Sequence, residues 1–259
     1  MDELIYILII LAFAMLLGST VGFGEALVFI PFATFFIDVR SAIVLMGFWG
    51  SALCILNSVK YRTDIDKHLI KKYLIPGTIG VILGSLLIVV PPTQWIDLVL
   101  GIFVLTYVGA KFYEMRKERK DREQKLKEQN LDNIPNYLFY SGAFSYSFLG
   151  GLIGASGPIN VVLLERAGYE RESFIANFSI ISLIISPVKL GIYVVSGLFP
   201  TELMLVFIIG FGVIIVSTKV GHWITPKIPR VEFQVIVLIL LIIIGARSII
   251  NSLFFILDM

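Results

Sequence analysis

Reactive and metal-binding side chains are scarce in this sequence. Its 259 residues include one cysteine, Cys54, and two histidines, His68 and His222, which lie far apart. One cysteine excludes a disulfide and any CxxC site, and two distant histidines argue against a metal centre. No GxxxxGK[ST] run occurs, which excludes a P-loop ATPase, and no cofactor signature or nucleophile–base pair at motif spacing supports an enzyme. We therefore predict a protein that is not an enzyme and has no cofactor or metal.

Charge is the second deficit. Charged residues make up 15% of the chain and hydrophobic residues 57%, whereas soluble domains have about 25% charged and about 45–50% apolar residues. The apolar residues come in runs long enough to cross a bilayer. The chain is therefore predicted to be an all-α integral membrane protein that is surrounded by lipid and binds no nucleic acid.

The apolar runs fall into two similar halves around a charged centre. The apolar segments are 3–37, 41–59, 73–90, 95–112, 137–165, 173–198, 202–220 and 232–256. Between the fourth and fifth of them, Lys, Arg, Glu and Gln dominate, which is typical of a solvated helical linker. We predict a first membrane repeat over 1–112, a cytoplasmic linker over 113–136 and a second membrane repeat over 137–259.

A glycine-rich stretch stands near the start of each half. The first runs from Gly18 to Val28, and the second runs, 132 residues later and without a gap, from Gly150 to Asn160. Glycine weakens a helix and Pro158 suits the first turn of a new one, so each stretch is predicted to be a helix that breaks and restarts. Such breaks inside a bilayer must be covered by protein or line a cavity, and they mark binding sites in transporters. The alternative is that these glycines only let helices pack closely.

Lys and Arg are absent from the loops at 91–94 and 199–201. Of the chain's 21 Lys and Arg, 18 fall in the other loops and in the linker. The positive-inside rule therefore places the linker in the cytoplasm and both termini outside, in the plasma or inner membrane of the cell. Segment 3–37 must then start and end outside and segment 137–165 inside, so each is expected to be a hairpin.

The returning arms of these hairpins are short. Residues 24–37 cover roughly 21 Å at about 1.5 Å per residue, less than the hydrocarbon thickness of about 30 Å. The hairpin tips are therefore expected to stop partway and approach each other. Each half then has a broken-helix hairpin plus three transmembrane helices, and the second half is inverted, with about eight transmembrane segments in about ten helical pieces.

At these residues the chain resembles the sulfite exporter TauE/SafE family of membrane transporters. That family has a glycine-rich run followed by a proline near the start of each half. The residues that carry the resemblance are Gly18, Gly22, Gly24 and Pro31 in the first copy and Gly150, Gly151, Gly154, Gly157 and Pro158 in the second. The resemblance implies export or uptake of a small sulfur-containing anion such as sulfite or an organosulfonate. Glu25 stands where the family's run usually has a small residue.

Two charged residues fall inside apolar segments. Lys189 lies deep in segment 173–198, where a charge costs at least about 2.5–3.5 kcal/mol on insertion scales, so it is expected to be paired or to bind an anion. Glu25 follows the first break and could cap the restarted helix. It could also pair with Lys189, either permanently or until its protonation frees the lysine for substrate.

We predict that an anion binds at mid-membrane between the two breaks. The predicted binding residues are Gly22, Gly24, Glu25, Asn57, Gly154, Ser156, Gly157, Asn160, Asn177, Ser186 and Lys189. The polar stripe that includes Asn177 could equally form hydrogen bonds between helices.

The expected function is secondary transport of a small sulfur-containing anion. The coupling ion, if there is one, is a proton or sodium. An anion channel or uniporter and a transporter of another small carboxylate are the alternatives, and the sequence sets no oligomeric state.

Overall fold

The computed structural model describes most of the chain. It describes residues 2–21, 23–90, 92–121, 134–169 and 171–224, together with 242, 245, 246, 249 and 250. Over these residues the chain forms nine α-helices and two 3₁₀-helices, with no strand. The elements are α1 (Asp2–Val21), α2 (Glu25–Ala33), α3 (Val39–Lys60), η1 (Arg62–Asp64), α4 (Lys67–Leu87), α5 (Thr93–Asp121), α6 (Asn136–Leu152), α7 (Gly157–Arg166), α8 (Arg171–Val195), η3 (Thr201–Leu203) and α9 (Met204–Ile224). The predicted all-α class is confirmed.

Five stretches are long and apolar enough to cross a membrane. They are Val39–Lys60, Lys67–Leu87, Thr93–Ala110, Glu172–Val195 and Thr201–Gly221. All five differ from the predicted bounds, by one to six residues at an end. The largest difference is at Lys67–Leu87, which was expected to begin at residue 73, because helices continue into the charged flanks. Helix α5, for example, runs to Asp121, beyond the predicted start of the linker. The predicted segment 232–256 lies largely outside the described residues, so the total of about eight crossings stays a prediction.

Both predicted helix breaks are present in the described residues. Gly24, between α1 and α2, has φ +100°, and Gly154, between α6 and α7, has φ +71°. This left-handed backbone is readily adopted only by glycine, which explains why glycines stand at the turns. The returning arms have 9 residues in α2 and 10 in α7, or about 14 and 15 Å of helix. Each arm is thus about half as long as a hydrocarbon core of about 30 Å.

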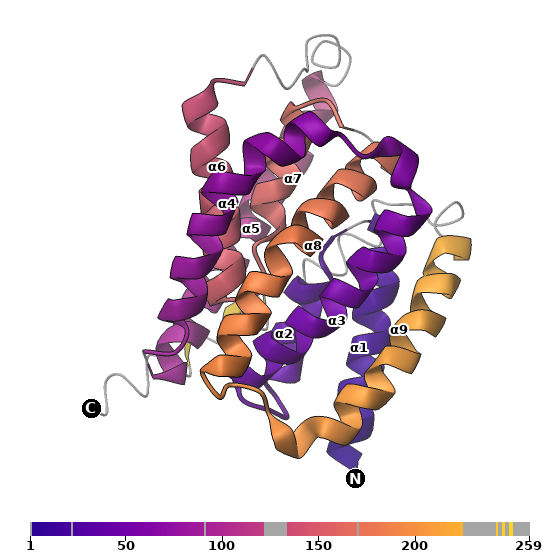
Figure 1. The fold of residues 1–259 in the computed structure, drawn as a ribbon, viewed down its shortest axis with the longest axis vertical. Coiled ribbons are helices and arrows are strands. Elements are labelled where there is room, and N and C mark those ends of the chain that lie inside the picture. Colours follow the sequence, from indigo (N-terminus) through magenta and orange to yellow (C-terminus); the bar gives the residue numbers. More distant parts are fainter. Residues whose placement is uncertain are drawn as a thin grey trace.

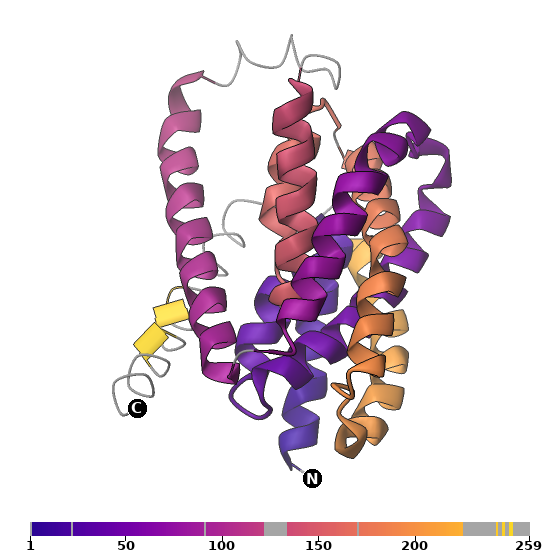
Figure 2. The same ribbon diagram turned by 60° about the vertical axis from the view of Figure 1, so that its left-hand side comes forward.

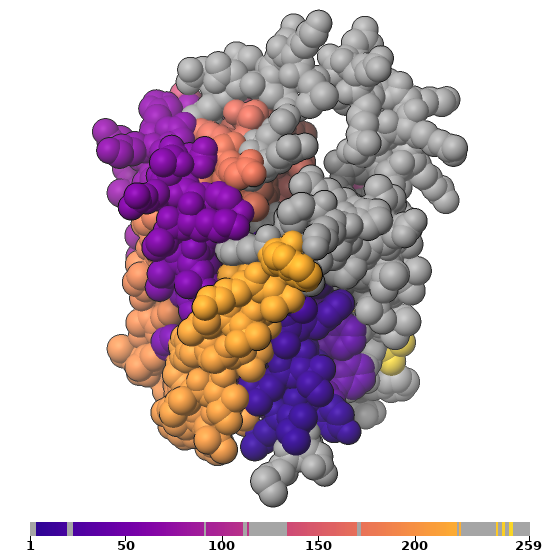
Figure 3. All heavy atoms as spheres, turned by 90° about the vertical axis from the view of Figure 1, so that its right-hand side faces the viewer, coloured from indigo at the N-terminus to yellow at the C-terminus, as the bar shows by residue number. Residues whose placement is uncertain are grey.

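Helices that are far apart in the chain pack in three pairs. Helix α3 lies against α8 at the centre, α1 lies against α9 on one side, and α4 lies against α6 on the other (Figure 1). Figure 3 shows α9 running along α1 on one face of the molecule. Helix α5 stands at an edge of the bundle (Figure 2), where it contacts α3. The two hairpins, α1–α2 and α6–α7, thus flank a central pair with one helix from each half.

The α4–α6 contact brings two backbones together. A Cβ atom added to Gly84 would lie 1.9 Å from the carbonyl oxygen of Phe148, and one added to Gly80 would lie 2.5 Å from the carbonyl oxygen of Phe144. Small residues at helix interfaces permit such an approach in membrane proteins. The approach is mutual, because a Cβ atom on Gly151 of α6 would lie 2.8 Å from the carbonyl oxygen of Val81 on α4.

Loops at each end of the bundle are tied to neighbouring helices. At the end that carries the N-terminus (Figure 1), Arg40 at the start of α3 donates from Nε to the carbonyl oxygen of Ile88, at 3.0 Å. At the opposite end, the segment between α3 and α4 is held by Asn177 of α8. Its amide oxygen accepts from the backbone N–H of Asp66 at 2.8 Å, and its amide nitrogen donates to the carbonyl oxygen of Asp64 at 2.9 Å.

Candidate functional site

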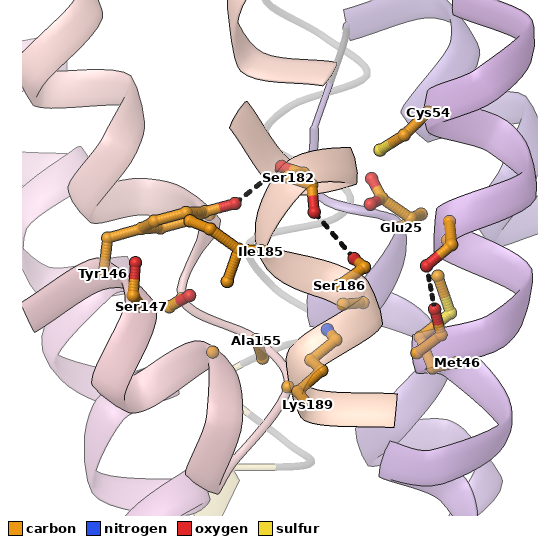
Figure 4. A pocket seen from close by; sticks show the side chains of 18 of the residues that line it. Glu25, Met46, Cys54, Tyr146, Ser147, Ala155, Ser182, Ile185, Ser186 and Lys189 are labelled. Atoms are coloured by element: carbon orange, nitrogen blue, oxygen red, sulfur yellow. Dashed lines mark hydrogen bonds between the residues drawn. The ribbon is translucent and has the colours of Figure 1, made fainter. Parts of the chain in front are cut away.

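A pocket lies where the two helix breaks meet. It has a volume of about 70 Å³ and is lined by both turns, one face of α3, the last turns of α6 and one face of α8 (Figure 4). A Cβ atom on Gly157 would lie 3.6 Å from the ring of Phe23, and one on Gly154 would lie 2.8 Å from the side chain of Ile30. The tips of the two hairpins are therefore in contact. Since one water needs about 10–15 Å³ of cavity, the pocket has room for a small oxyanion.

Two helix N-termini open into this pocket. Gly24 and Glu25 at the start of α2, and Ser156 and Gly157 at the start of α7, all line it. Neither Gly24 nor Ser156, the N-cap residues, caps its helix with a side-chain hydrogen bond. The first N–H groups of each helix therefore lack an intrahelical partner, and the helix dipole places partial positive charge at the same ends. Such termini attract anions.

Each hairpin uses a glycine to make space for a polar group of its own returning arm. A Cβ atom on Gly18 would lie 2.8 Å from Oε2 of Glu25, and one on Gly150 would lie 2.8 Å from Oγ of Ser156. Gly18 and Gly150 are the first glycines of the two duplicated stretches. Gly150 lines the pocket, whereas Gly18 lies behind Glu25, which lines it. A Cβ atom on Gly18 would also lie 2.8 Å from the side chain of Leu53 on α3, so this glycine permits close helix packing as well.

Helix α3 contributes a face of small residues. Gly47, Gly50, Ser51 and Cys54 line the pocket and follow the i, i+3, i+4, i+7 spacing of one helical face. The Ser51 hydroxyl donates to the carbonyl oxygen of Gly47 at 2.7 Å. Among the residues that the structure describes, no cluster of three or more His, Cys, Asp or Glu side chains could hold a metal ion. Cys54 is thus a small, buried wall residue here.

Helix α8 contributes Ser182, Ser186 and Lys189, which also share a helical face. Ser182 donates to the carbonyl oxygen of Phe178 at 2.8 Å, and Ser186 donates to that of Ser182 at 2.7 Å. These hydroxyl protons are committed to the helix backbone, so the two side chains offer lone pairs to a ligand. Lys189 carries the one cationic side chain on the pocket wall.

Glu25 and Lys189 both point into the pocket (Figure 4) but form no ion pair in the structure. Oε2 of Glu25 is buried without a hydrogen-bond partner among the described residues. The carboxylate instead occupies the space next to Gly18 and Gly50, whose missing side chains leave room for it. The predicted direct pair is therefore not formed, and the two ionisable side chains lie apart on the wall of one cavity.

The structure brings most of the predicted binding residues together. Those that line the pocket are Gly24, Glu25, Gly154, Ser156, Gly157, Ser186 and Lys189. Asn57, Asn160 and Asn177 do not line it, and Gly22 lies outside the described residues. Asn160 is fully buried in α7, and neither polar atom of its side chain has a hydrogen-bond partner among the described residues.

Asn177 belongs to a structural cluster at the end of the bundle. Besides its bonds to the α3–α4 segment, it donates to the carbonyl oxygen of Ser173 at 2.7 Å, so its side chain is occupied. Next to it, the hydroxyl of Tyr169 donates to the carboxylate of Asp66, which also accepts from the backbone N–H groups of His68 and Leu69. Partial burial alone would raise the pKa of Asp66, but these hydrogen bonds outweigh it and lower the pKa below its usual value.

Several pocket residues were not predicted from the sequence. They are Gly47, Gly50, Ser51, Cys54, Tyr146 and Ser147, whereas Ser182 belongs to the polar stripe of segment 173–198 that includes Asn177 and Ser186. The i, i+3, i+4, i+7 spacing of small residues in an apolar segment was the signal on α3. Tyr146 carried no comparable signal, because its role depends on the 2.7 Å hydrogen bond between its hydroxyl and that of Ser182 on another helix.

Comparison with known protein families gives a match over most of the chain. A family model described as "Sulfite exporter TauE/SafE" matches residues 7–248. No curated protein and no solved structure matches the chain. The matched range includes both helix breaks and every residue of the pocket.

Proposed function

The chain belongs to the sulfite exporter TauE/SafE family, and on this premise we propose that it is a secondary transporter that binds a small sulfur-containing anion in the pocket between its two helix breaks. The observation that carries the proposal is the convergence of two uncapped helix N-termini and Lys189 on one cavity. These groups supply N–H donors and positive charge where an oxyanion would lie.

The packing of the helices supports an inverted repeat. If α1, α3 and α4 correspond to α6, α8 and α9, exchange of the two halves turns the α1–α9 contact into the α6–α4 contact and maps the α3–α8 contact onto itself. A pseudo-two-fold axis between α3 and α8 would have this effect. In such transporters the substrate lies at the interface of the repeats, which here is the position of the pocket.

The charge of the loops supports an orientation. One end of the bundle would face the cytoplasm by the positive-inside rule. This end carries the basic residues Lys60, Arg62, Arg166 and Lys219. The opposite end, with the N-terminus and η3, would face outside. With a cytoplasm that is negative, each anionic charge that leaves gains about 2.3 kcal/mol per 100 mV, so export needs no coupling ion, whereas uptake needs a co-transported proton or sodium.

Sulfite counterflow in proteoliposomes tests this function. A carrier loaded inside with unlabelled sulfite will accumulate labelled sulfite transiently and saturably, whereas a channel will not. Lys189→Gln should weaken sulfite binding by roughly 10- to 100-fold, because a hydrogen bond to a charged group contributes about 1.5–3 kcal/mol. The matched control is Lys219→Gln on α9, since Lys219 is exposed and outside the pocket. Equal loss in both variants, or no sulfite flux at all, would contradict the proposal.

Competition with the sulfite flux distinguishes a transporter of sulfur-containing anions from a transporter of small carboxylates. Acetate and sulfite each present an anionic oxygen to the same donors, so a carboxylate transporter would show stronger inhibition of the flux by acetate. We expect sulfite and sulfonates to compete more strongly, as the family membership indicates.

A further inference from the structure

The polar groups of the pocket are of two kinds. Lys189, the first N–H groups of α7 and the hydroxyl of Ser156 are hydrogen-bond donors. The carboxylate of Glu25 and the oxygen lone pairs of Ser51, whose proton is committed to the helix backbone, are acceptors. Ser182 and Ser186 on α8 are acceptors for the same reason.

The principal donor and the principal acceptor lie over neighbouring positions of α3. Nζ of Lys189 lies 3.9 Å from the position of a Cβ atom on Gly47, and Oε1 of Glu25 lies 4.0 Å from that of a Cβ atom on Gly50. Residues three apart on a helix have Cβ positions about 5–6 Å from each other. Both glycines line the pocket, with Leu190 packed beside Gly47 and Met46 beside Gly50. Lys189 and Glu25 line the same cavity next to these two positions, so one small molecule in the pocket can reach both side chains.

A simple anion satisfies only half of this site. Its oxygens would accept from Lys189, but it would leave Oε2 of Glu25 buried without a partner, as it is now. It would also place a second negative charge in a cavity of about 70 Å³ that already holds a carboxylate. A buried acceptor without a donor and two like charges in a small cavity both weaken binding.

We propose that the pocket selects an oxyanion that carries its own hydrogen-bond donor, with the oxyanion on Lys189 and the donor on Glu25. This inference rests on the proposed function and narrows its substrate class. Two kinds of molecule have the required chemistry. One is a protonated inorganic oxyanion such as hydrogen sulfite, which has an acidic proton, and the other is a small aminosulfonate, which has an ammonium group. Fully deprotonated sulfite and plain alkylsulfonates lack the donor.

Two ligands that differ in one group test the proposal. Aminomethanesulfonate and methanesulfonate share a sulfonate, and only the first has an amino group, whose N–H groups can donate to a carboxylate. Binding of each to the purified full-length protein in lipid nanodiscs is measured by calorimetry at neutral pH. The wild type should bind aminomethanesulfonate at least about tenfold more tightly, because its amino group adds a hydrogen bond to the carboxylate of Glu25.

Glu25→Gln should abolish this preference, because it should weaken the binding of aminomethanesulfonate and strengthen the binding of methanesulfonate. Glu202→Gln in η3 is the matched control, since Glu202 is exposed and outside the pocket, and it should keep the preference. If Glu25→Gln fails to fold, the wild-type preference and the Glu25→Asp variant, which keeps the charge and retracts it by one methylene, still decide the matter. Equal binding of the two ligands by the wild type would overturn the proposal.

The outcomes also separate this inference from the proposed function. If methanesulfonate binds as tightly as aminomethanesulfonate and Lys189→Gln weakens both, the anion site stands and the requirement for a donor is wrong. If sulfite, methanesulfonate and aminomethanesulfonate all fail to bind, both proposals are wrong. Sulfite titrations over the pH range in which hydrogen sulfite loses its proton identify the source of the donor. If the affinity for sulfite follows the population of hydrogen sulfite, the result supports the inorganic ligand. If it does not, and aminomethanesulfonate binds tightly, the result supports the aminosulfonate.

Discussion

Gly18 in α1 offers a direct test of how the pocket is shaped. A Cβ atom at this position would lie 2.8 Å from Oε2 of Glu25, whereas an ordinary contact begins at 3.4 Å. The side chain of Leu53 on α3 lies equally close, at 2.8 Å. Gly18→Ala therefore requires both the carboxylate and the Leu53 side chain to move by at least about 0.6 Å, since the glycine belongs to a continuous helix and α1 is fixed by its packing on α9. The open side toward which the carboxylate can move is the pocket.

The size of the effect follows from Coulomb's law. For an anion about 5 Å from the carboxylate, an approach of about 0.6–1 Å raises the repulsion by roughly 0.4–0.8 kcal/mol at an effective dielectric constant of about 20. Lost space in a cavity of about 70 Å³ adds to this. We expect Gly18→Ala to weaken methanesulfonate binding by roughly two- to tenfold. Stability should fall by no more than about 2 kcal/mol, because crowding of Glu25 and Leu53 costs about 1–3 kcal/mol and alanine gains about 1 kcal/mol over glycine in a helix.

A double-mutant cycle with Glu25→Ala identifies the cause. If Gly18→Ala acts through the carboxylate, it will have no effect on methanesulfonate affinity once Glu25 is alanine. Gly212→Ala on α9 is the control, because a Cβ atom there meets nothing within 4 Å, and it should leave binding unchanged. An equal loss of affinity from Gly18→Ala with and without the carboxylate would refute the reasoning.

Three further predictions concern stability, each measured by thermal unfolding of the purified protein in detergent. Gly84→Ala should destabilise by about 1–3 kcal/mol or more, because its Cβ atom would lie 1.9 Å from the carbonyl oxygen of Phe148; Gly109→Ala, with nothing within 4 Å of its Cβ atom, should not. Tyr169→Phe should cost about 1–2 kcal/mol through the lost hydrogen bond to Asp66, and an unchanged unfolding temperature would contradict this. Because the pKa of Asp66 is lowered in the folded state, its contribution is present above the usual carboxyl pKa and is lost as the pH falls through the lowered value. The unfolding temperature should therefore fall as the pH is lowered, and this decrease should be smaller in Asp66→Asn than in the wild type.

The helix breaks could be predicted from the sequence because their cause is local. Gly24 and Gly154 adopt a backbone conformation that other residues avoid, and this preference is visible without any tertiary contact. Lys189 could be assigned to the site for a similar reason. A charge within an apolar segment must face the interior of the protein, and the interior of this bundle is the pocket.

The remaining site residues depend on contacts that no local pattern specifies. Asn177 and Ser186 are both polar residues of one apolar segment, but Asn177 faces the α3–α4 segment and bonds to its backbone, whereas Ser186 faces the pocket. Which helix packs on each face decides the difference. The same holds for the position of Glu25, because it depends on the space beside Gly50 of α3, which is brought next to α2 only by the fold.

The seam between α4 and α6 limits how this molecule can change shape. A carbonyl group that packs against a glycine cannot shift by one residue along the neighbouring helix without a steric clash with a side chain. Helices α4 and α6 are therefore expected to move together as one rigid body. Any motion that opens the pocket first to one side and then to the other must then take place elsewhere, at the contacts of α3 and α8 with their neighbours. A crosslink that joins α4 to α6 should leave transport intact, whereas one that joins α3 to α8 should stop it.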